Sequence, residues 1–303
     1  MNTKHRIFFI KSNLTCVFAS LSFAAGFPAL EILLTDWGVI SVVLVRNTIA
    51  FIFILVVWLL IEGSKKLKYA NWLKGFIIGA LGFGLGSLLL VITQLLTSTF
   101  VAALAAALMP LAAISLEIIF DKRKMSVSFL FGLILVIFGS VILLEKTTID
   151  LEYSVGLLLG LFSVTFFAWG SRASVKHLPN MTTLARTTTT TLGMCGFCLL
   201  IYLIFSFLRL GETHIPKINL SHTKLLIIYA CIGLAISQIL WISAVQKIGI
   251  GIASLHLNIT PFYVMVILFF MGYEWLWIQA VGASIIVTGI SLTQLNYKKI
   301  KQF

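Results

Sequence analysis

The feature that most constrains this chain is a succession of ten apolar runs separated by short polar connections. A helix that crosses a lipid bilayer needs about 17 to 25 predominantly apolar residues, and each run is close to that length. No connection is long enough for a separate domain. The fold class that we predict is all-α and polytopic, with ten transmembrane helices at residues 14–34, 38–61, 72–96, 99–119, 127–144, 154–175, 183–206, 224–245, 250–271 and 275–294.

The charge content supports a membrane protein and gives its orientation. Charged residues make up 11% of the 303 residues, against roughly 25% in a soluble domain. Of the 22 Lys and Arg residues, Arg46 and Arg186 lie inside predicted spans, and all but four of the others lie on the side of the termini. By the positive-inside rule, we expect both termini to be cytoplasmic in a multi-pass protein of the cytoplasmic (inner) membrane. The net charge of +12 therefore indicates topology, and we expect no nucleic-acid partner.

The two halves of the chain repeat one another. The matching residues, at offsets between 140 and 151, are Gly26 with Gly170, Arg46 with Arg186, Gly82 with Gly233, Ala102 with Ala253, Pro110 with Pro261, Gly132 with Gly282 and Gly139 with Gly289. Each half holds five predicted spans, so the two repeats, 14–144 and 154–294, enter the membrane from opposite sides. Inverted repeats of this kind are typical of secondary transporters, with a substrate site near the midplane between the halves.

The order and spacing of several short motifs resemble a known family. The motifs are Phe23 to Ala29, Leu44 to Ala50, Ala102 to Pro110 leading to Asp121, and Ala253 to Pro261 followed by Gly272-Tyr273-Glu274. Together they resemble the drug/metabolite transporter (DMT) superfamily, specifically its ten-helix transporters with two EamA domains. The family usually closes the fourth helix with Gly-Glu, where this chain has Phe120-Asp121-Lys122-Arg123. The resemblance implies a carrier of amino acids or other small metabolites, often an exporter.

Two arginines are the strongest candidates for substrate contacts. An ionisable side chain inside a membrane is costly and is a functional candidate by default. Arg46 lies about eight residues into the second predicted helix, and Arg186 lies nearer the cytoplasmic end of the seventh. Either guanidinium would hold a carboxylate by charge-assisted hydrogen bonds. The alternative interpretation is that they cap helix carbonyls or, for Arg186, extend to the membrane surface.

Other polar and aromatic side chains inside the spans are weaker candidates for the same site. They are Gln94, Trp169, Gln238, Trp241, His256 and Asn258. Helix periodicity puts His256 and Thr260 on one face and Asn258 on another. Each of these side chains suits either a substrate cavity or a link between helices.

Four residues are candidate hinges for gating: Gly26, Pro28, Pro110 and Pro261. A proline inside a helix frees a backbone carbonyl and bends the helix, which a bilayer tolerates only where the break is packed or lines a cavity. The matched positions of Pro110 and Pro261 favour a gate or a site.

We therefore hypothesise a secondary transporter, not an enzyme, that moves a small amino-acid-like metabolite by alternating access, with no cofactor and no metal. Its expected partners are the substrate and the lipid bilayer, and a monomer is the working assumption. A multidrug or lipophilic-cation exporter is an alternative, although it would favour a buried carboxylate. A non-transporting assembly or lipid-binding protein is another, and a packed midplane would favour it. For energy coupling we hypothesise uniport or exchange, with proton antiport through Glu31 or His256 as the weaker alternative.

Overall fold

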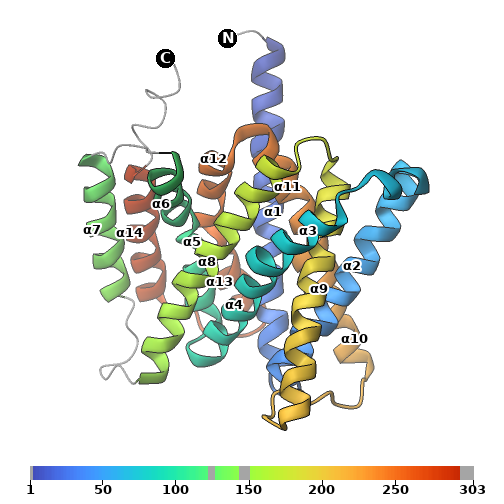
Figure 1. The fold of residues 1–303 in the computed structure, drawn as a ribbon. Coiled ribbons are helices and arrows are strands. Elements are labelled where there is room, and N and C mark those ends of the chain that lie inside the picture. Colours follow the sequence, from blue (N-terminus) through green and yellow to red (C-terminus); the bar gives the residue numbers. More distant parts are fainter. Residues whose placement is uncertain (1–2, 122–126, 143–150, 294–303) are drawn as a thin grey trace.

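A computed structural model describes residues 3–121, 127–142 and 151–293. All regular structure in these ranges is helical, and the helices lie side by side as a bundle (Figure 1). Eight helical stretches are long and apolar enough to cross a membrane: Ile10–Leu33, Val39–Glu62, Trp72–Leu96, Thr99–Phe120, Leu151–His177, Thr183–Leu208, Leu220–Ile248 and Ile250–Phe270. Shorter apolar stretches, Leu130–Gly139 and Trp277–Leu292, occupy the other two predicted spans.

Six of the ten predicted spans are single helices. They are α1 (Thr3–Leu33), α2 (Val39–Glu62), α7 (Val127–Ile142), α8 (Leu151–His177), α9 (Thr183–Leu208) and α14 (Trp277–Thr293). α1 starts well before the predicted residue 14. The predicted repeat ends at residues 144 and 294, and the Lys122-Arg123 part of the fourth-helix motif, lie outside the described residues.

The other four spans are interrupted, and the interruptions occur at matching places in the two repeats. The third span consists of α3 (Trp72–Ile78), the π-helix η2 (Gly79–Gly84) and α4 (Leu85–Leu96), and the eighth of α10 (Leu220–Ile227), the π-helix η3 (Ile228–Ile236) and α11 (Ser237–Ile248). The fourth is split into α5 (Thr99–Ala107) and α6 (Met109–Asp121), and the ninth into α12 (Ile250–Ser254), the 3-10 helix η4 (Leu255–Ile259) and α13 (Thr260–Phe270). π-Helical turns are rare and concentrate at functional sites.

Contacts between the helices follow the repeat. α1 packs against η3 and α11, and its repeat counterpart α8 packs against η2 and α4. α2 packs against its own counterpart α9, and α7 against its counterpart α14. A Cβ atom on Gly26 would lie 3.5 Å from Gly233 Cα, and one on Gly82 would lie 2.6 Å from Gly170 Cα. The crossing of α1 with η3 and the crossing of α8 with η2 are therefore the same crossing, made once in each repeat.

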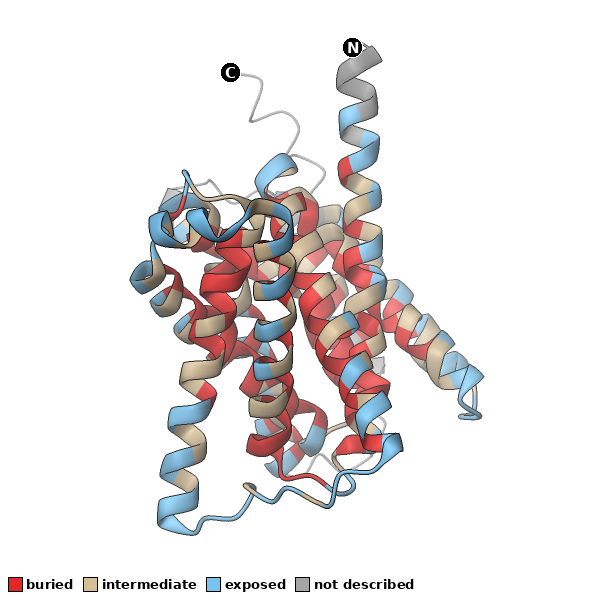
Figure 2. Ribbon diagram, turned by 90° about the vertical axis from the view of Figure 1, so that its right-hand side faces the viewer, coloured by how far each residue is buried: buried red, intermediate tan, exposed pale blue. Residues whose placement is uncertain are grey.

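The buried residues form the centre of the bundle, and the exposed residues lie on its outer faces (Figure 2). Large exposed hydrophobic side chains include Leu60, Phe131, Phe162, Leu203 and Phe270. Such extensive apolar exposure is rare on a soluble protein and fits contact with lipid. We call the face where α1 begins the terminus side, and the face that carries the connections at 34–38, 97–98, 209–219 and 271–276 the loop side (Figure 1).

A segment of the second repeat caps the first turn of α2. The Val39 amide donates to Glu212 Oε2 at 3.1 Å, and the Ile40 amide to the Glu212 carbonyl at 3.0 Å. A carboxylate at a helix N-terminus satisfies free amides and complements the helix dipole. We expect Glu212→Ala to lower the free energy of unfolding by about 1 kcal/mol, measured by thermal unfolding in detergent. Glu212→Gln should lower the free energy of unfolding by less, and Lys217→Ala, at an exposed position, should leave it unchanged. An unchanged stability of Glu212→Ala would contradict this role.

Candidate functional site

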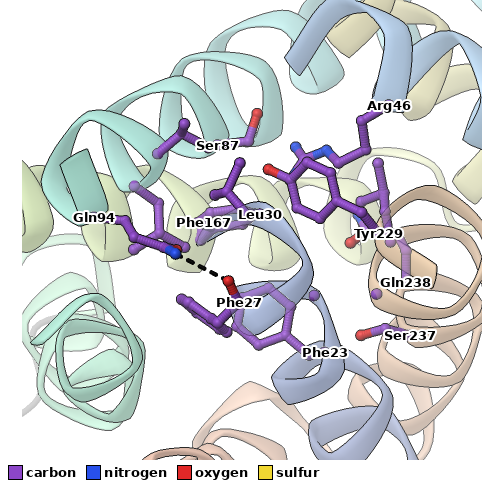
Figure 3. Close-up of a pocket in the computed structure, with 15 residues that line it drawn as sticks. Phe23, Phe27, Leu30, Arg46, Ser87, Gln94, Phe167, Tyr229, Ser237 and Gln238 are labelled. Carbon is purple, nitrogen blue, oxygen red and sulfur yellow. Dashed lines mark hydrogen bonds between the residues drawn. The ribbon is translucent and has the colours of Figure 1, made fainter. Parts of the chain in front are cut away.

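A cavity lies between the two halves of the chain, which we call the loop-side cavity. It has a volume of about 40 Å³, room for a few water molecules. Its walls come from α1, α2 and α4 of the first repeat and from α8, η3 and α11 of the second. Figure 3 shows the lining residues, which include Phe23, Phe27, Leu30, Arg46, Ser87, Gln94, Phe167, Tyr229, Ser237 and Gln238.

A second space of about 50 Å³, the terminus-side cavity, continues from the first. Both are lined by Phe23, Leu90, Phe167, Ser237 and Gln238. The second is otherwise lined mostly by apolar side chains, among them Met109, Trp241 and Leu257. The central space therefore has a polar portion nearer the loop side and a largely apolar portion nearer the terminus side.

Arg46 is the charged group of the loop-side cavity. It is 7% exposed, its Nη1 donates to the Tyr229 hydroxyl at 2.9 Å and its Nε to Asn47 Oδ1 at 3.1 Å. The guanidinium also lies over the Tyr229 ring, with Cζ 4.7 Å from the ring centroid. Nη2 has no hydrogen-bond partner among the described residues. Two neutral groups thus orient a buried cation whose remaining donors are free for an anion.

Gln94 faces the same cavity from α4 and has a fixed orientation. Its Nε2 donates to the Phe27 carbonyl at 2.9 Å and to Thr99 Oγ1 at 2.8 Å. A carbonyl only accepts hydrogen bonds, so the amide nitrogen must face Phe27 and the amide oxygen must point away. Within the described chain, that buried Oε1 has no partner.

Gln238 supplies a third unpaired polar atom. The side chain is 6% exposed, and its buried Nε2 lacks a partner in the part of the chain that the structure describes. Unpaired buried polar groups cost about 1–3 kcal/mol each. Three of them on the residues that line one cavity, two donors and one acceptor, indicate a ligand that supplies the missing partners.

Arg186, the repeat counterpart of Arg46, has a different environment. Its Nε donates to the Leu178 carbonyl at 2.8 Å and its Nη2 to the Pro179 carbonyl at 2.9 Å, just beyond the end of α8. It lines neither cavity. At the repeat offset of 151, the residue that corresponds to Tyr229 is Ile78, which offers no hydroxyl. This geometry fits the alternative interpretation of a helix-end cap.

Of the remaining polar and aromatic candidates, one lines a cavity and three line neither. Trp241 lines the terminus-side cavity, and its Nε1 donates to Ser171 Oγ at 2.9 Å. Trp169 lies against Gly82 at the crossing of η2 and α8 and lines neither cavity. His256 and Asn258 lie in η4, also outside both lining sets.

One prediction about this segment is wrong. Residues Leu255–Ile259 form a 3-10 helix, in which side chains three apart align. His256 and Thr260 are four apart and are rotated by about 120° in such a helix, so the α-helical face expected for them is not formed.

The four candidate hinges take different positions. Gly26 lines the loop-side cavity, and Pro28 lies within the continuous α1. Pro110 follows the break between α5 and α6, and Pro261 begins α13 after the 3-10 turn. Proline suits both places because the first turn of a helix has no intrahelical acceptor for its missing amide hydrogen.

Several lining residues were not singled out from the sequence, chiefly Phe23, Phe27, Phe167 and Tyr229. Aromatic residues in apolar runs are too common to stand out. The sequence contains one clue to Tyr229, which is that the matched position in the first repeat holds an isoleucine. Its pairing with Arg46 spans 183 residues and requires knowledge of how the two halves pack.

Arg46 is the charged side chain that lines the central space in the part of the chain that the structure describes. No group of three or more His, Cys, Asp or Glu that would hold a metal ion occurs among the described residues. Within the described chain no carboxylate lines either cavity, so the local charge in the central space is positive.

Comparison with known proteins gives a family and a fold. The model of a family described as "EamA-like transporter family" matches residues 10–145 and again residues 154–295. No curated protein matches the chain. Among solved structures, a chain described only as "Crystal structure of protein" is similar, with a TM-score of 0.72 and 15% identity, covering 96% of this chain and 98% of that one. At that identity the likeness concerns the fold.

Proposed function

The chain belongs to the EamA-like transporter family, and on that premise we propose that it moves a small carboxylate-bearing metabolite, of the amino-acid type, across the cytoplasmic membrane by alternating access. The family and the apolar helices make it a multi-pass membrane transporter of the DMT type. Substrate, direction and mechanism are the proposal. The observation that carries it is the loop-side cavity, where the buried Arg46 has a free donor.

The polarity of the cavity supports a zwitterion. Arg46 Nη2 and Gln238 Nε2 are unpaired donors suited to a carboxylate, and Gln94 Oε1 is an unpaired acceptor suited to an ammonium group. Phe23 and Phe167, which line both cavities, offer an apolar wall to a side chain. The positive charge disfavours a lipophilic cation, and the match to a transporter family disfavours a non-transporting assembly subunit.

The remaining aspects of the function rest on the sequence. Both termini are cytoplasmic in this proposal because the basic residues concentrate on their side. Export is proposed on the strength of the resemblance to metabolite exporters. We further propose that the protein functions as a monomer and that transport is driven by the substrate's own gradient. Strict dependence of uptake on a proton gradient in reconstituted vesicles would contradict that coupling.

Counterflow in proteoliposomes tests the substrate class. Vesicles preloaded with unlabelled compound are offered labelled alanine, leucine or phenylalanine, a carboxylate without an amino group such as lactate, or tetraphenylphosphonium. We expect accumulation of the amino acids and not of the cation. Accumulation of tetraphenylphosphonium alone would support the multidrug alternative, and flux of no compound would contradict the proposed class.

A further inference from the structure

A chain of hydrogen bonds leaves the loop-side cavity at Gln94 and ends at a carboxylate. Gln94 Nε2 donates to Thr99 Oγ1 at 2.8 Å, and Thr99 Oγ1 donates to Glu31 Oε2 at 2.8 Å. The three residues come from α4, α5 and α1. Because Gln94 uses its nitrogen for Thr99 and Phe27, its unpaired oxygen is directed away from them, and Gln94 itself lines the cavity.

Glu31 and Thr99 also line a separate pocket at the loop side, which we call the vestibule. It has a volume of about 320 Å³ and includes Tyr273, Glu274 and Trp275 from the connection between α13 and α14. Glu31 is only partly buried, so it has access to protons from that pocket. The chain Gln94–Thr99–Glu31 thus joins the vestibule to the central cavity.

The other titratable groups near Glu31 are few. Tyr273 and Glu274 line the vestibule with it, and burial, followed by the neighbouring Glu31 carboxylate, raises the pKa of the Tyr273 hydroxyl. α4 and α5 contain no titratable side chain. The titratable residues on the other elements packed against α1 are Tyr229 and Cys231 on η3, Lys247 on α11, His256 on η4, Tyr263 on α13, and His222 and Lys224 on α10. None of these lines the vestibule.

We propose that Glu31 is a proton-binding site whose ionised form positions Gln94 through Thr99, so that proton uptake at Glu31 weakens substrate binding in the loop-side cavity. The statement about substrate rests on the proposed function, whereas the coupling of Glu31 to Gln94 does not.

The direction of the effect follows from hydrogen-bond chemistry. An ionised Glu31 only accepts, so the Thr99 hydroxyl donates to it and the Thr99 oxygen is left to accept from Gln94. A hydrogen bond to a charged group is about twice as strong as one between neutral groups. When Glu31 takes up a proton, the Thr99 hydroxyl keeps only a weaker, neutral acceptor, so its hold on the Gln94 amide nitrogen loosens and the Phe27 carbonyl is left as the firmer partner of Gln94. Affinity for a substrate that uses Gln94 Oε1 is therefore highest with Glu31 ionised.

Infrared difference spectroscopy of the purified full-length protein, recorded between neutral and acidic pH, tests the coupling without any substrate. We expect a carboxyl band that is absent in Glu31→Gln, together with a side-chain amide shift that is absent in Gln94→Leu. Thr99→Val should keep the carboxyl band and lose the amide shift, and Thr99→Ser should restore it. Glu274→Gln, from the same vestibule, is the matched control and should keep both signals. An amide shift that persists in Glu31→Gln or in Thr99→Val would overturn the proposal.

Counterflow of labelled leucine, with the same pH on both sides of the vesicle, tests the consequence for transport. We expect KM to rise as the pH is lowered from neutral, by about tenfold once Glu31 is fully protonated. Glu31→Gln should show a high KM that does not depend on pH, and Glu274→Gln should follow the native profile. A native KM independent of pH would overturn the link to substrate. If none of the compounds in the panel is carried, the proposed function fails, and the infrared result still decides the coupling.

Discussion

Replacing Arg46 with glutamine is expected to lower kcat/KM for a carboxylate-bearing substrate on the order of 100-fold. Arg46 is the only charged side chain that lines the loop-side cavity in the described structure, and its Nη2 is unpaired there. Losing one side of a buried, hydrogen-bonded charge pair costs about 2–5 kcal/mol, which is where the magnitude comes from. The measurement is counterflow of labelled leucine by native and variant protein reconstituted at equal amounts.

Arg46→Lys distinguishes charge from geometry. Lysine keeps the positive charge but has a single ammonium group in place of the planar fork. It cannot reproduce the contacts to the Tyr229 hydroxyl and Asn47 Oδ1 while also offering a donor at the position of Nη2. We expect kcat/KM for Arg46→Lys to lie between the values for the native protein and for Arg46→Gln. Tyr229→Phe, which removes only the orienting hydroxyl, should raise KM by about 5- to 10-fold.

Arg186→Gln is the matched control because it alters the repeat counterpart. Its guanidinium holds the carbonyls of Leu178 and Pro179, so the change should lower thermal stability and leave the KM of the folded fraction unchanged. Equal effects of the two substitutions on KM would contradict the assignment of the substrate anion to Arg46. Full transport by Arg46→Gln would contradict it outright.

The fold was largely predictable because membrane and repeat signals are both strong in this chain. Apolar runs of fixed length locate the helices, and matched glycines such as Gly82 and Gly233 reveal the repeat within the sequence itself. The π-helical turns at those glycines were not predictable. They depend on how closely α1 and α8 approach them, which a one-dimensional pattern does not contain.

The site was predictable only in part, for a similar reason. Arg46, Gln94 and Gln238 stood out because polar side chains are costly inside a membrane, and all three line one cavity. That criterion does not separate Arg46 from Arg186, which has the same residue type at the matched position. What separates them is that Arg46 bonds to the Tyr229 hydroxyl, whereas the position that matches Tyr229 in the first repeat holds Ile78. The repeat therefore identifies equivalent positions, whereas the substitutions between its copies indicate where function departs from symmetry.

Gly79→Ala is expected to destabilise the protein by about 3 kcal/mol or more, although alanine favours helices. A Cβ atom at Gly79 would overlap the backbone carbonyl of Thr190 and lie 2.7 Å from its Cα. Backbone atoms do not rotate away as a side chain does, so α9 would have to move away from η2. Forced overpacking of a tight interface typically costs about 1–3 kcal/mol and occasionally more. Thermal unfolding in detergent measures the loss.

Gly26→Ala is the matched control for the same substitution in another helix. Its Cβ atom would lie 3.4 Å from the Tyr229 ring and 3.5 Å from Gly233 Cα, which are ordinary contacts. We expect its stability to be unchanged or higher by up to about 1 kcal/mol, from the better helix propensity of alanine. Equal losses in both variants would show that glycine is needed for some reason other than the approach of α9.

Combining Gly79→Ala with Gly193→Ala tests whether one interface is responsible. Gly193 lies on α9 and approaches the same partner from the other side, since its Cβ atom would overlap the Phe76 carbonyl and lie 2.7 Å from the Ala80 amide nitrogen. If either substitution alone already separates the two helices, the second should cost much less than it does in the native background, giving a coupling of about 0.5–3 kcal/mol. Strictly additive losses would instead place the two glycines in independent contacts. The contact between α9 and η2 would then not be the single close-packed interface that this geometry describes.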